Sequence, residues 1–119
     1  MAKLRFRGFE IHKGYLDPKA QQELIDALRP VLKAAPLFSP SVSGGGKMSV
    51  RMTSSGQFGW FSDASGYRYT DTHPKGQVWP EIPDKVLSIW HQLTGIERQP
   101  ECCLLNYYGE DAKMGLHQD

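Results

Sequence analysis

The feature that most constrains the fold lies near the end of the printed sequence. Residues 101–108 form a continuous apolar run of strand length. Residues 109–112 are turn-like, and residues 113–119 read as a second extended stretch. Two strands joined by a short turn form an antiparallel hairpin, so the sequence predicts a β-ribbon here.

The register of this hairpin decides which side chains share a face. If residues 109–112 are the loop, Tyr108 lies opposite Lys113 and Asn106 lies opposite Gly115. Because side chains alternate between faces along a strand, the candidate polar side chains, apart from Gln118, would then lie together on one face. Its members are Leu104, Asn106, Tyr108, Lys113, Gly115, His117 and Asp119. A bulge or an odd loop length would shift the register and separate them.

His117 and Asp119 are the candidate metal ligands. At a spacing of two residues on a strand, both side chains point to one side, as two ligands of a 2-His-1-carboxylate iron site must. Such a site leaves coordination positions open for a cosubstrate and oxygen. The alternative from these two residues alone is a surface histidine beside an acidic residue.

The N-terminal part of the chain predicts short strands followed by a helix. Apolar residues alternate over residues 4–11 before a break at Gly14. The pair Asp17-Pro18 is a helix start, because Asp accepts from free amides and Pro at the first position gives up no needed donor. Pro30 is expected to kink or end that helix. The apolar side chains at helical spacing are Leu24, Ile25, Leu28, Val31 and Leu32.

The middle of the chain, residues 39–80, is rich in Gly, Ser and Thr with large side chains between them. The stretch at residues 39–47 alone would be a mobile loop. The alternating large residues after it indicate two or three short strands instead, with turns at residues 54–56 and 64–66. A second helix is predicted from about Pro83 to a stop at Gly95.

Composition limits the class of protein. A chain of 119 residues with 39% hydrophobic content predicts one domain, with no linker between separate parts. The two cysteines, Cys102 and Cys103, are neighbours and cannot form the disulfide framework of a secreted mini-domain, so a cytoplasmic location is expected. No apolar run is long enough to predict a membrane span.

The charge is unevenly distributed although the formal total is only +1. Residues 1–80 hold eleven Lys and Arg against six Asp and Glu, and residues 81–119 hold three against seven. A polyanion would therefore meet the first part of the chain. Solvated surfaces often drift in this way, so the asymmetry favours nucleic acid only mildly.

Several separated motifs resemble, in order, those of the AlkB family of Fe(II)- and 2-oxoglutarate-dependent dioxygenases. The resemblance covers the chain from about Gly44 onwards, and several ordered matches are more specific than one short motif. The matching stretches are Met48-Ser49-Val50, Met52-Thr53, Gly59-Trp60, Gly66-Tyr67, Trp79-Pro80, residues 103–108, Ala112-Lys113 and residues 116–119.

The resemblance implies an α+β fold that is the N-terminal part of a jelly roll, with two helices packed on the sheet. It implies Fe(II) held by His117 and Asp119, with O2 and 2-oxoglutarate as cosubstrates and Asn106 and Tyr108 contacting 2-oxoglutarate. An amide and a phenol can both donate to a carboxylate. Packing of Tyr108 and backbone bonding of Asn106 remain the alternatives.

The resemblance also divides the chain into three parts within one domain. Residues 1–38 supply an N-terminal strand and helix, residues 39–80 a nucleotide-recognition lid, and residues 81–119 a helix and the first core strands. Substrate contacts are implied for Met48, Met52, Trp60, Tyr67, Lys113 and Gln118. A small hydrophobic core under the loop is the alternative for Trp60 and the methionines.

The function that follows is oxidative dealkylation of N-alkylated bases in single-stranded DNA or RNA. A distal His and later Arg residues of the family pattern are not found, so the chain is expected to be incomplete and inactive alone. A second chain carrying the remainder is one explanation. The rival functions are a nucleic-acid-binding module without chemistry, and a related dioxygenase acting on a protein, lipid or small molecule.

Overall fold

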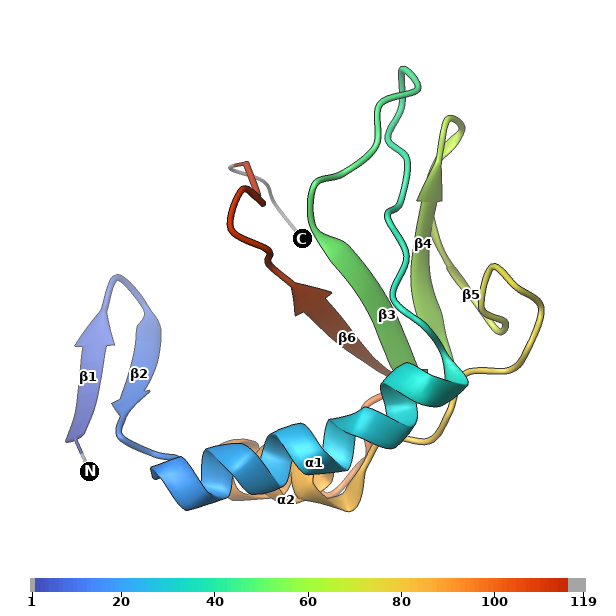
Figure 1. Cartoon of the computed structure of the whole chain (residues 1–119). Helices are drawn as coiled ribbons and strands as arrows, with labels where there is room; N and C mark the ends of the chain where they lie inside the picture. Colours follow the sequence, from blue (N-terminus) through green and yellow to red (C-terminus); the bar gives the residue numbers. More distant parts are fainter. Residues whose placement is uncertain (1, 116–119) are drawn as a thin grey trace.

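The protein has a mixed α and β architecture, seen in a computed structural model that describes residues 2–115 (Figure 1). Within this range two helices accompany six strands, which form three separate two-stranded antiparallel sheets. The predicted α+β class is therefore confirmed. None of the helices in this range has the length and apolar character needed to cross a membrane.

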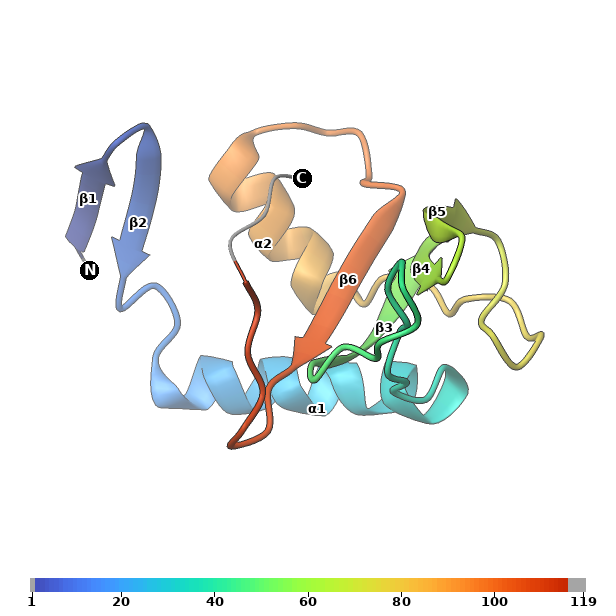
Figure 2. The same ribbon diagram turned by 90° about the horizontal axis from the view of Figure 1, so that it is seen from above.

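The first sheet pairs β1 (Ala2–Phe6) with β2 (Phe9–Lys13), where the sequence predicts short strands. Its two-residue turn has positive φ at both positions, 49° at Arg7 and 87° at Gly8, as a tight hairpin requires. In two views at right angles the ribbon stands beyond the N-terminal end of the first helix, away from the other strands (Figures 1 and 2).

Helix α1 (Pro18–Ala34) begins where the sequence predicts. The Asp17 carboxylate accepts from the Ala20 amide at 2.7 Å, which satisfies one of the free donors of the first turn. The expected early end at Pro30 is wrong, because the helix continues to Ala34 and the Ala35 amide donates to the Val31 carbonyl at 2.8 Å. A proline removes one helical donor, and the residues after it still form theirs.

Helix α2 (Asp84–Thr94) also confirms its prediction, with Gly95 in the left-handed conformation that ends it. It lies beside α1 (Figure 2). Lys85 Nζ is 2.7 Å from Glu23 Oε2, and the Tyr15 hydroxyl donates to Gln92. The two helices thus form a pair under the sheets.

The central sheet joins β3 (Arg51–Gly56) to β6 (Cys102–Tyr107), which lie far apart in sequence. The turn predicted at residues 54–56 is wrong. Ser54 and Ser55 lie in β3 and are fully buried, and β3 pairs with β6 along its whole length. Thr53 Oγ1 donates to the Ala35 carbonyl at 2.7 Å and so fixes the sheet to the end of α1.

The third sheet pairs β4 (Gly59–Asp63) with β5 (Gly66–Thr70), around the turn predicted at residues 64–66. A buried cluster of rings packs behind it. His73 is 5.4 Å from Phe38 and 5.3 Å from Trp79, measured between ring centroids. Trp79 lies over Gly59, and its indole donates to the Thr70 carbonyl at 2.9 Å.

Gly59 is expected to be required for this packing. A Cβ at this position would lie 2.1 Å from the Trp79 ring, so Gly59→Ala must displace the indole. We expect it to lower the free energy of unfolding by about 1–3 kcal/mol, measured by denaturant titration. Gly46→Ala is the control, since its Cβ would meet only Val42 at 3.6 Å. Equal stability of the two variants would contradict the packing shown here.

Candidate functional site

The β3–β6 pairing positions Asn106, a predicted cosubstrate contact. In the antiparallel register Asn106 lies opposite Met52, so the two side chains share a face. Asn106 is exposed, whereas Met52 is 1% exposed. The amide is therefore accessible at the end of a strand whose neighbour is firmly packed.

The predicted ribbon of residues 101–119 is not formed within the described range. β6 ends at Tyr107, so Tyr108 lies just outside the strand, with 51% of its surface exposed. Lys113 and Gly115 lie outside any strand. The described strand partner of β6 is β3, which the sequence pattern could not reveal because β3 lies some fifty residues earlier. The predicted opposition of Tyr108 to Lys113 is wrong.

The structure describes the chain only to Gly115. The candidate metal ligands His117 and Asp119, and the candidate substrate residue Gln118, therefore lie outside the described residues. Within residues 2–115, no three His, Cys, Asp or Glu side chains gather in a way that could hold a metal ion.

Ser49 holds the segment that leads to these ligands. Its hydroxyl accepts from the Lys113 amide at 2.9 Å and donates to the Lys113 carbonyl at 3.1 Å. A second bond closes the preceding turn, from the Ala112 amide to the Gly109 carbonyl at 3.1 Å. Ser49 stands immediately before the buried Val50 that leads into β3, so the segment is tied to the packed core. Ser49 was not predicted as a site residue, and its only signal in the sequence is its place in the motif Met48-Ser49-Val50.

Trp60 and Tyr67 occupy one face of the β4–β5 ribbon. Their ring centroids are 6.0 Å apart and the planes are inclined by only 18°, an offset stack. Tyr67 is 67% exposed and Trp60 is half-buried. The Trp60 amide donates to Ser54 Oγ at 3.2 Å, which anchors the base of this strand to β3. The structure thus brings together two of the predicted substrate contacts.

The two methionines predicted to contact substrate differ in their surroundings. Met48 is half-buried, and its amide donates to the Pro40 carbonyl at 2.8 Å. Met52 is part of the core and has no surface to offer a ligand. Its contact with substrate stays a prediction, since in the described residues the Met52 side chain packs in the core.

Asp63 and Arg68 brace the tip of the same ribbon on its other face. The guanidinium approaches the Asp63 carboxylate at 2.8 and 3.1 Å and lies 5.0 Å from the Phe61 ring centroid. Hydrogen bonds from Arg68, and then from the hydroxyl and amide of Ser65, hold the pKa of Asp63 far below its usual value. The charges of this pair offset each other.

His73 and the two cysteines are held in the packed part of the protein. His73 is 2% exposed, with one ring nitrogen 2.8 Å from the Pro36 carbonyl and the other accepting from the Lys75 amide at 3.0 Å. Burial raises the pKa of the Cys102 thiol and of the Cys103 thiol, which keeps both protonated near neutral pH. None of these groups is placed to serve as a catalytic nucleophile.

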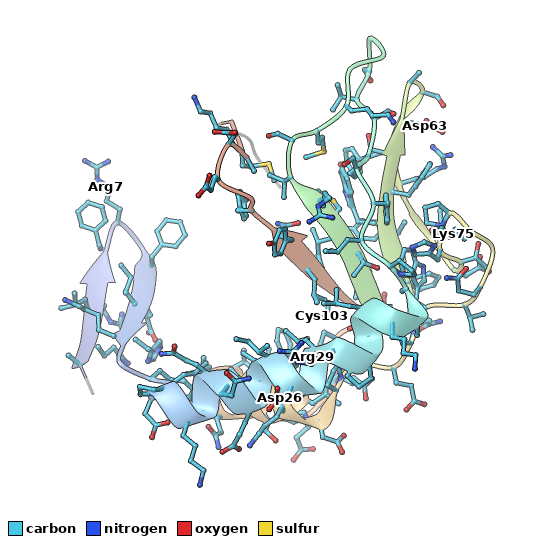
Figure 3. The ribbon with its side chains drawn as sticks, in the orientation of Figure 1. Arg7, Asp26, Arg29, Asp63, Lys75 and Cys103 are labelled. Atoms are coloured by element: carbon cyan, nitrogen blue, oxygen red, sulfur yellow. The ribbon has the colours of Figure 1, made fainter. Side chains whose placement is uncertain are left out.

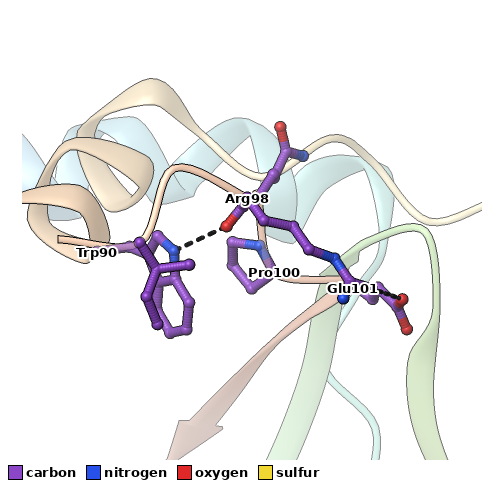
Figure 4. Close-up of a pocket in the computed structure, with 6 residues that line it drawn as sticks. Trp90, Arg98, Pro100 and Glu101 are labelled. Carbon is purple, nitrogen blue, oxygen red and sulfur yellow. Dashed lines mark hydrogen bonds and ion pairs between the residues drawn. The ribbon is translucent and has the colours of Figure 1, made fainter. Parts of the chain in front are cut away.

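A surface hollow of about 350 Å³ lies elsewhere, between the end of α2 and the start of β6 (Figure 4). Its lining residues are Trp90, Ile96, Arg98, Gln99, Pro100 and Glu101. Asn106 and Tyr108 come at the other end of β6, roughly 17 Å further along the strand. The hollow is therefore separate from the predicted cosubstrate contacts.

Comparison with known proteins gives this arrangement a family. Residues 8–119 match the model of the 2OG-Fe(II) oxygenase superfamily, which is nearly the whole chain. The chain belongs to the 2OG-Fe(II) oxygenase superfamily. Its predicted resemblance to the AlkB branch of these oxygenases is confirmed by the relatives described next.

Three relatives show the extent of the likeness. The chain is 44% identical to an alpha-ketoglutarate-dependent dioxygenase AlkB homolog of Caulobacter vibrioides, over 94% of this chain and 51% of that protein. It is 36% identical to the AlkB dioxygenase of Salmonella typhimurium, over 85% and 49%. It is 26% identical to the DNA N(6)-methyladenine demethylase ALKBH1D of Arabidopsis thaliana, over 94% and 29%. The chain spans about half the length of the first two.

The residues present fit the groups that a 2OG-Fe(II) oxygenase binds as far as they are described. Asn106 and Tyr108 carry an amide and a phenol that can donate to a carboxylate, and both are exposed at one end of β6. Arg51 lies 4.9 Å from the ring centroid of Tyr107, its cross-strand neighbour, and adds positive charge nearby. The sequence pattern did not predict this Arg51–Tyr107 contact.

Loss of the Ser49 hydroxyl should loosen the approach to the metal-ligand motif. Ser49→Ala removes two hydrogen bonds to Lys113, and one such bond contributes about 1 kcal/mol. We expect the Lys113 amide to exchange its hydrogen about fivefold faster or more, measured by NMR. Ser43→Ala, an exposed serine in the neighbouring turn, is the control. Unchanged exchange at Lys113 would show that Ser49 does not hold this segment.

The Asp63–Arg68 pair should survive mild acid. A carboxyl with a lowered pKa stabilises the folded state above its unfolded pKa, about 3.9, and loses that contribution only as pH falls through the folded value. We expect the Asp63 carboxyl to stay ionised at pH 4 in an NMR titration, and its midpoint to rise in Arg68→Gln. Arg5→Gln, far along the chain, should leave it unchanged. An equal midpoint in both variants would exclude Arg68 as the cause.

Proposed function

We propose that the protein catalyses the oxidative dealkylation of N-alkylated bases in single-stranded DNA or RNA. The observation that carries the proposal is the Trp60–Tyr67 stack, in which Tyr67 is exposed and Trp60 half-buried, on a ribbon whose base is anchored beside the strand that bears Asn106. Membership of the 2OG-Fe(II) oxygenase superfamily supports the chemistry, and the name of the Arabidopsis relative supports a nucleic-acid substrate. We further propose that the whole protein closes into a jelly roll.

The cosubstrate would be held at the end of β6. Asn106 would donate from its amide, and Tyr108 from its phenol, to the carboxylate groups of 2-oxoglutarate. His117 and Asp119 would supply two of the ligands of Fe(II), and a distal His would complete the set. Bound iron supplies, with 2-oxoglutarate and O2, the oxidation of the alkyl carbon, after which the base is released with an aldehyde as the second product.

The protein's own side chains would select and hold the base. An enzyme that acts on a base must take it out of the stack, and the half-buried indole of Trp60 offers a flat surface on which the base can stack. Met48 would pack at the margin of the base. Tyr67, Lys113 and Gln118 would contact the phosphate backbone, with the Lys113 backbone fixed by Ser49.

The test is turnover of a single-stranded oligonucleotide that carries one N-methylated base. We expect aldehyde and succinate in equal amounts, both dependent on Fe(II), 2-oxoglutarate and O2. Trp60→Ala should lower kcat/KM by about tenfold to hundredfold, the range expected for loss of one base stack, and Trp60→Phe should recover most of it. Phe9→Ala, an exposed ring on the separate β1–β2 ribbon, is the matched control.

The outcomes separate this proposal from its rivals. Affinity for the oligonucleotide that ignores iron and 2-oxoglutarate, with no turnover, would indicate a binding module. Oxidation of 2-oxoglutarate that an alkylated oligonucleotide does not stimulate would indicate a dioxygenase with another class of substrate. Full turnover by Trp60→Ala would rule out Trp60 as the base platform.

A further inference from the structure

A third aromatic ring, Tyr69, lies on the same face of the β4–β5 ribbon as Trp60 and Tyr67. The register places Tyr69 directly opposite Trp60, and Tyr67 opposite Ser62, so all four side chains share one face. Tyr69 is 60% exposed. The opposite face carries Phe61 and Arg68, so the two tyrosines are separated from the packed cluster by the ribbon itself.

The three rings differ in their contacts and in their exposure to solvent. Tyr67 leans diagonally across the ribbon to stack on Trp60, at 6.0 Å between centroids. Tyr69, although closer in register to Trp60, keeps most of its surface in solvent. The exposed ring of Tyr69 lies opposite the partly exposed stack, so this face of the ribbon offers a second ring on which a base can stack.

The segment that contains the ribbon carries a small excess of positive charge, which suits a polyanion. Residues 38–80 carry four basic side chains, Lys47, Arg51, Arg68 and Lys75, against two acidic ones, Asp63 and Asp71. The ion pair of Asp63 with Arg68 removes one of each, so three positive charges stand against one negative. Lys75 lies on the loop that follows β5, with Asp63 at the ribbon tip (Figure 3).

We infer that Tyr69 is a second stacking position, which binds the nucleotide next to the target base in a single strand. This inference rests on the proposed function and deepens it, because it makes the enzyme prefer a polynucleotide over a free alkylated nucleotide. Two successive bases would stack on Trp60 and Tyr69, and the excess of positive charge in this segment would favour binding of the phosphate between them. The ring thus selects the length of the substrate and takes no part in the chemistry.

A cross-strand tyrosine could instead serve only to stabilise the hairpin. The two roles differ in what they do to substrates of different length. A flanking-base platform acts only when a flanking base is present. A hairpin stabiliser acts through Trp60 and would weaken the binding of every substrate alike.

The experiment compares a methylated mononucleotide with a short single-stranded oligonucleotide that carries the same central base. Tyr69→Leu keeps an apolar strand residue without a flat ring, and Tyr69→Phe keeps the ring. We expect Tyr69→Leu to weaken oligonucleotide binding about tenfold, measured without O2, and to raise KM with little change in kcat. Its affinity for the mononucleotide should be unchanged, and Tyr69→Phe should behave as the unmodified protein. Val78→Ala, an exposed apolar residue of the same segment, is the matched control.

Three results would overturn the inference. The first is unchanged oligonucleotide affinity in Tyr69→Leu, and the second is an equal loss for both substrates. Either can occur while the unmodified protein still dealkylates the oligonucleotide, so the proposed function would stand. The third is no oligonucleotide binding by the unmodified protein, which would overturn the proposed function and this inference together.

Discussion

The antiparallel pairing of β3 with β6 is the contact on which the rest of the structure depends. It joins residues 51–56 to residues 102–107 and buries the polar stretch Thr53, Ser54 and Ser55 between its neighbours. Each of the first two hydroxyls then fixes another element, since Thr53 binds the end of α1 and Ser54 binds the start of β4. A strand with apolar residues in these places could pack, but it could not tie three elements together through directed bonds.

The same strand pair also connects the proposed substrate contacts to the proposed cosubstrate contacts. The β4–β5 ribbon that carries Trp60 and Tyr67 is anchored to β3 at Ser54, and the exposed Asn106 lies one residue before the end of the partner strand. Ser49, just before β3, holds the segment that leads towards His117. A rigid central sheet can therefore keep the base platform and the cosubstrate donors in a fixed relation, which a reaction between two bound molecules requires.

Local signals in the sequence predicted the two helices, the short N-terminal strands, the turn at residues 64–66 and, over residues 101–108, the strand observed at residues 102–107. The Asp17 cap and the Gly95 stop depend on residues within one turn of the helix end, so they can be inferred from neighbours alone. The partner of β6 could not be inferred in this way. The sequence pattern predicted residues 113–119 as the partner of β6. The structure instead pairs β6 with β3, whose residues Ser54 and Ser55 had been predicted to form a turn.

The sequence by itself determined the family and the residue types of the candidate site, because ordered motifs and the alternation of side chains are properties of the chain. It also determined that two aromatic side chains, Trp60 and Tyr67, are candidates for contact with a base. Only the tertiary structure decided which side chains reach solvent. Met52 and Trp60 are both candidate substrate contacts in the sequence, yet Met52 is 1% exposed in the structure, whereas Trp60 is half-buried beside the exposed Tyr67. Burial depends on contacts between distant segments, and no local pattern contains them.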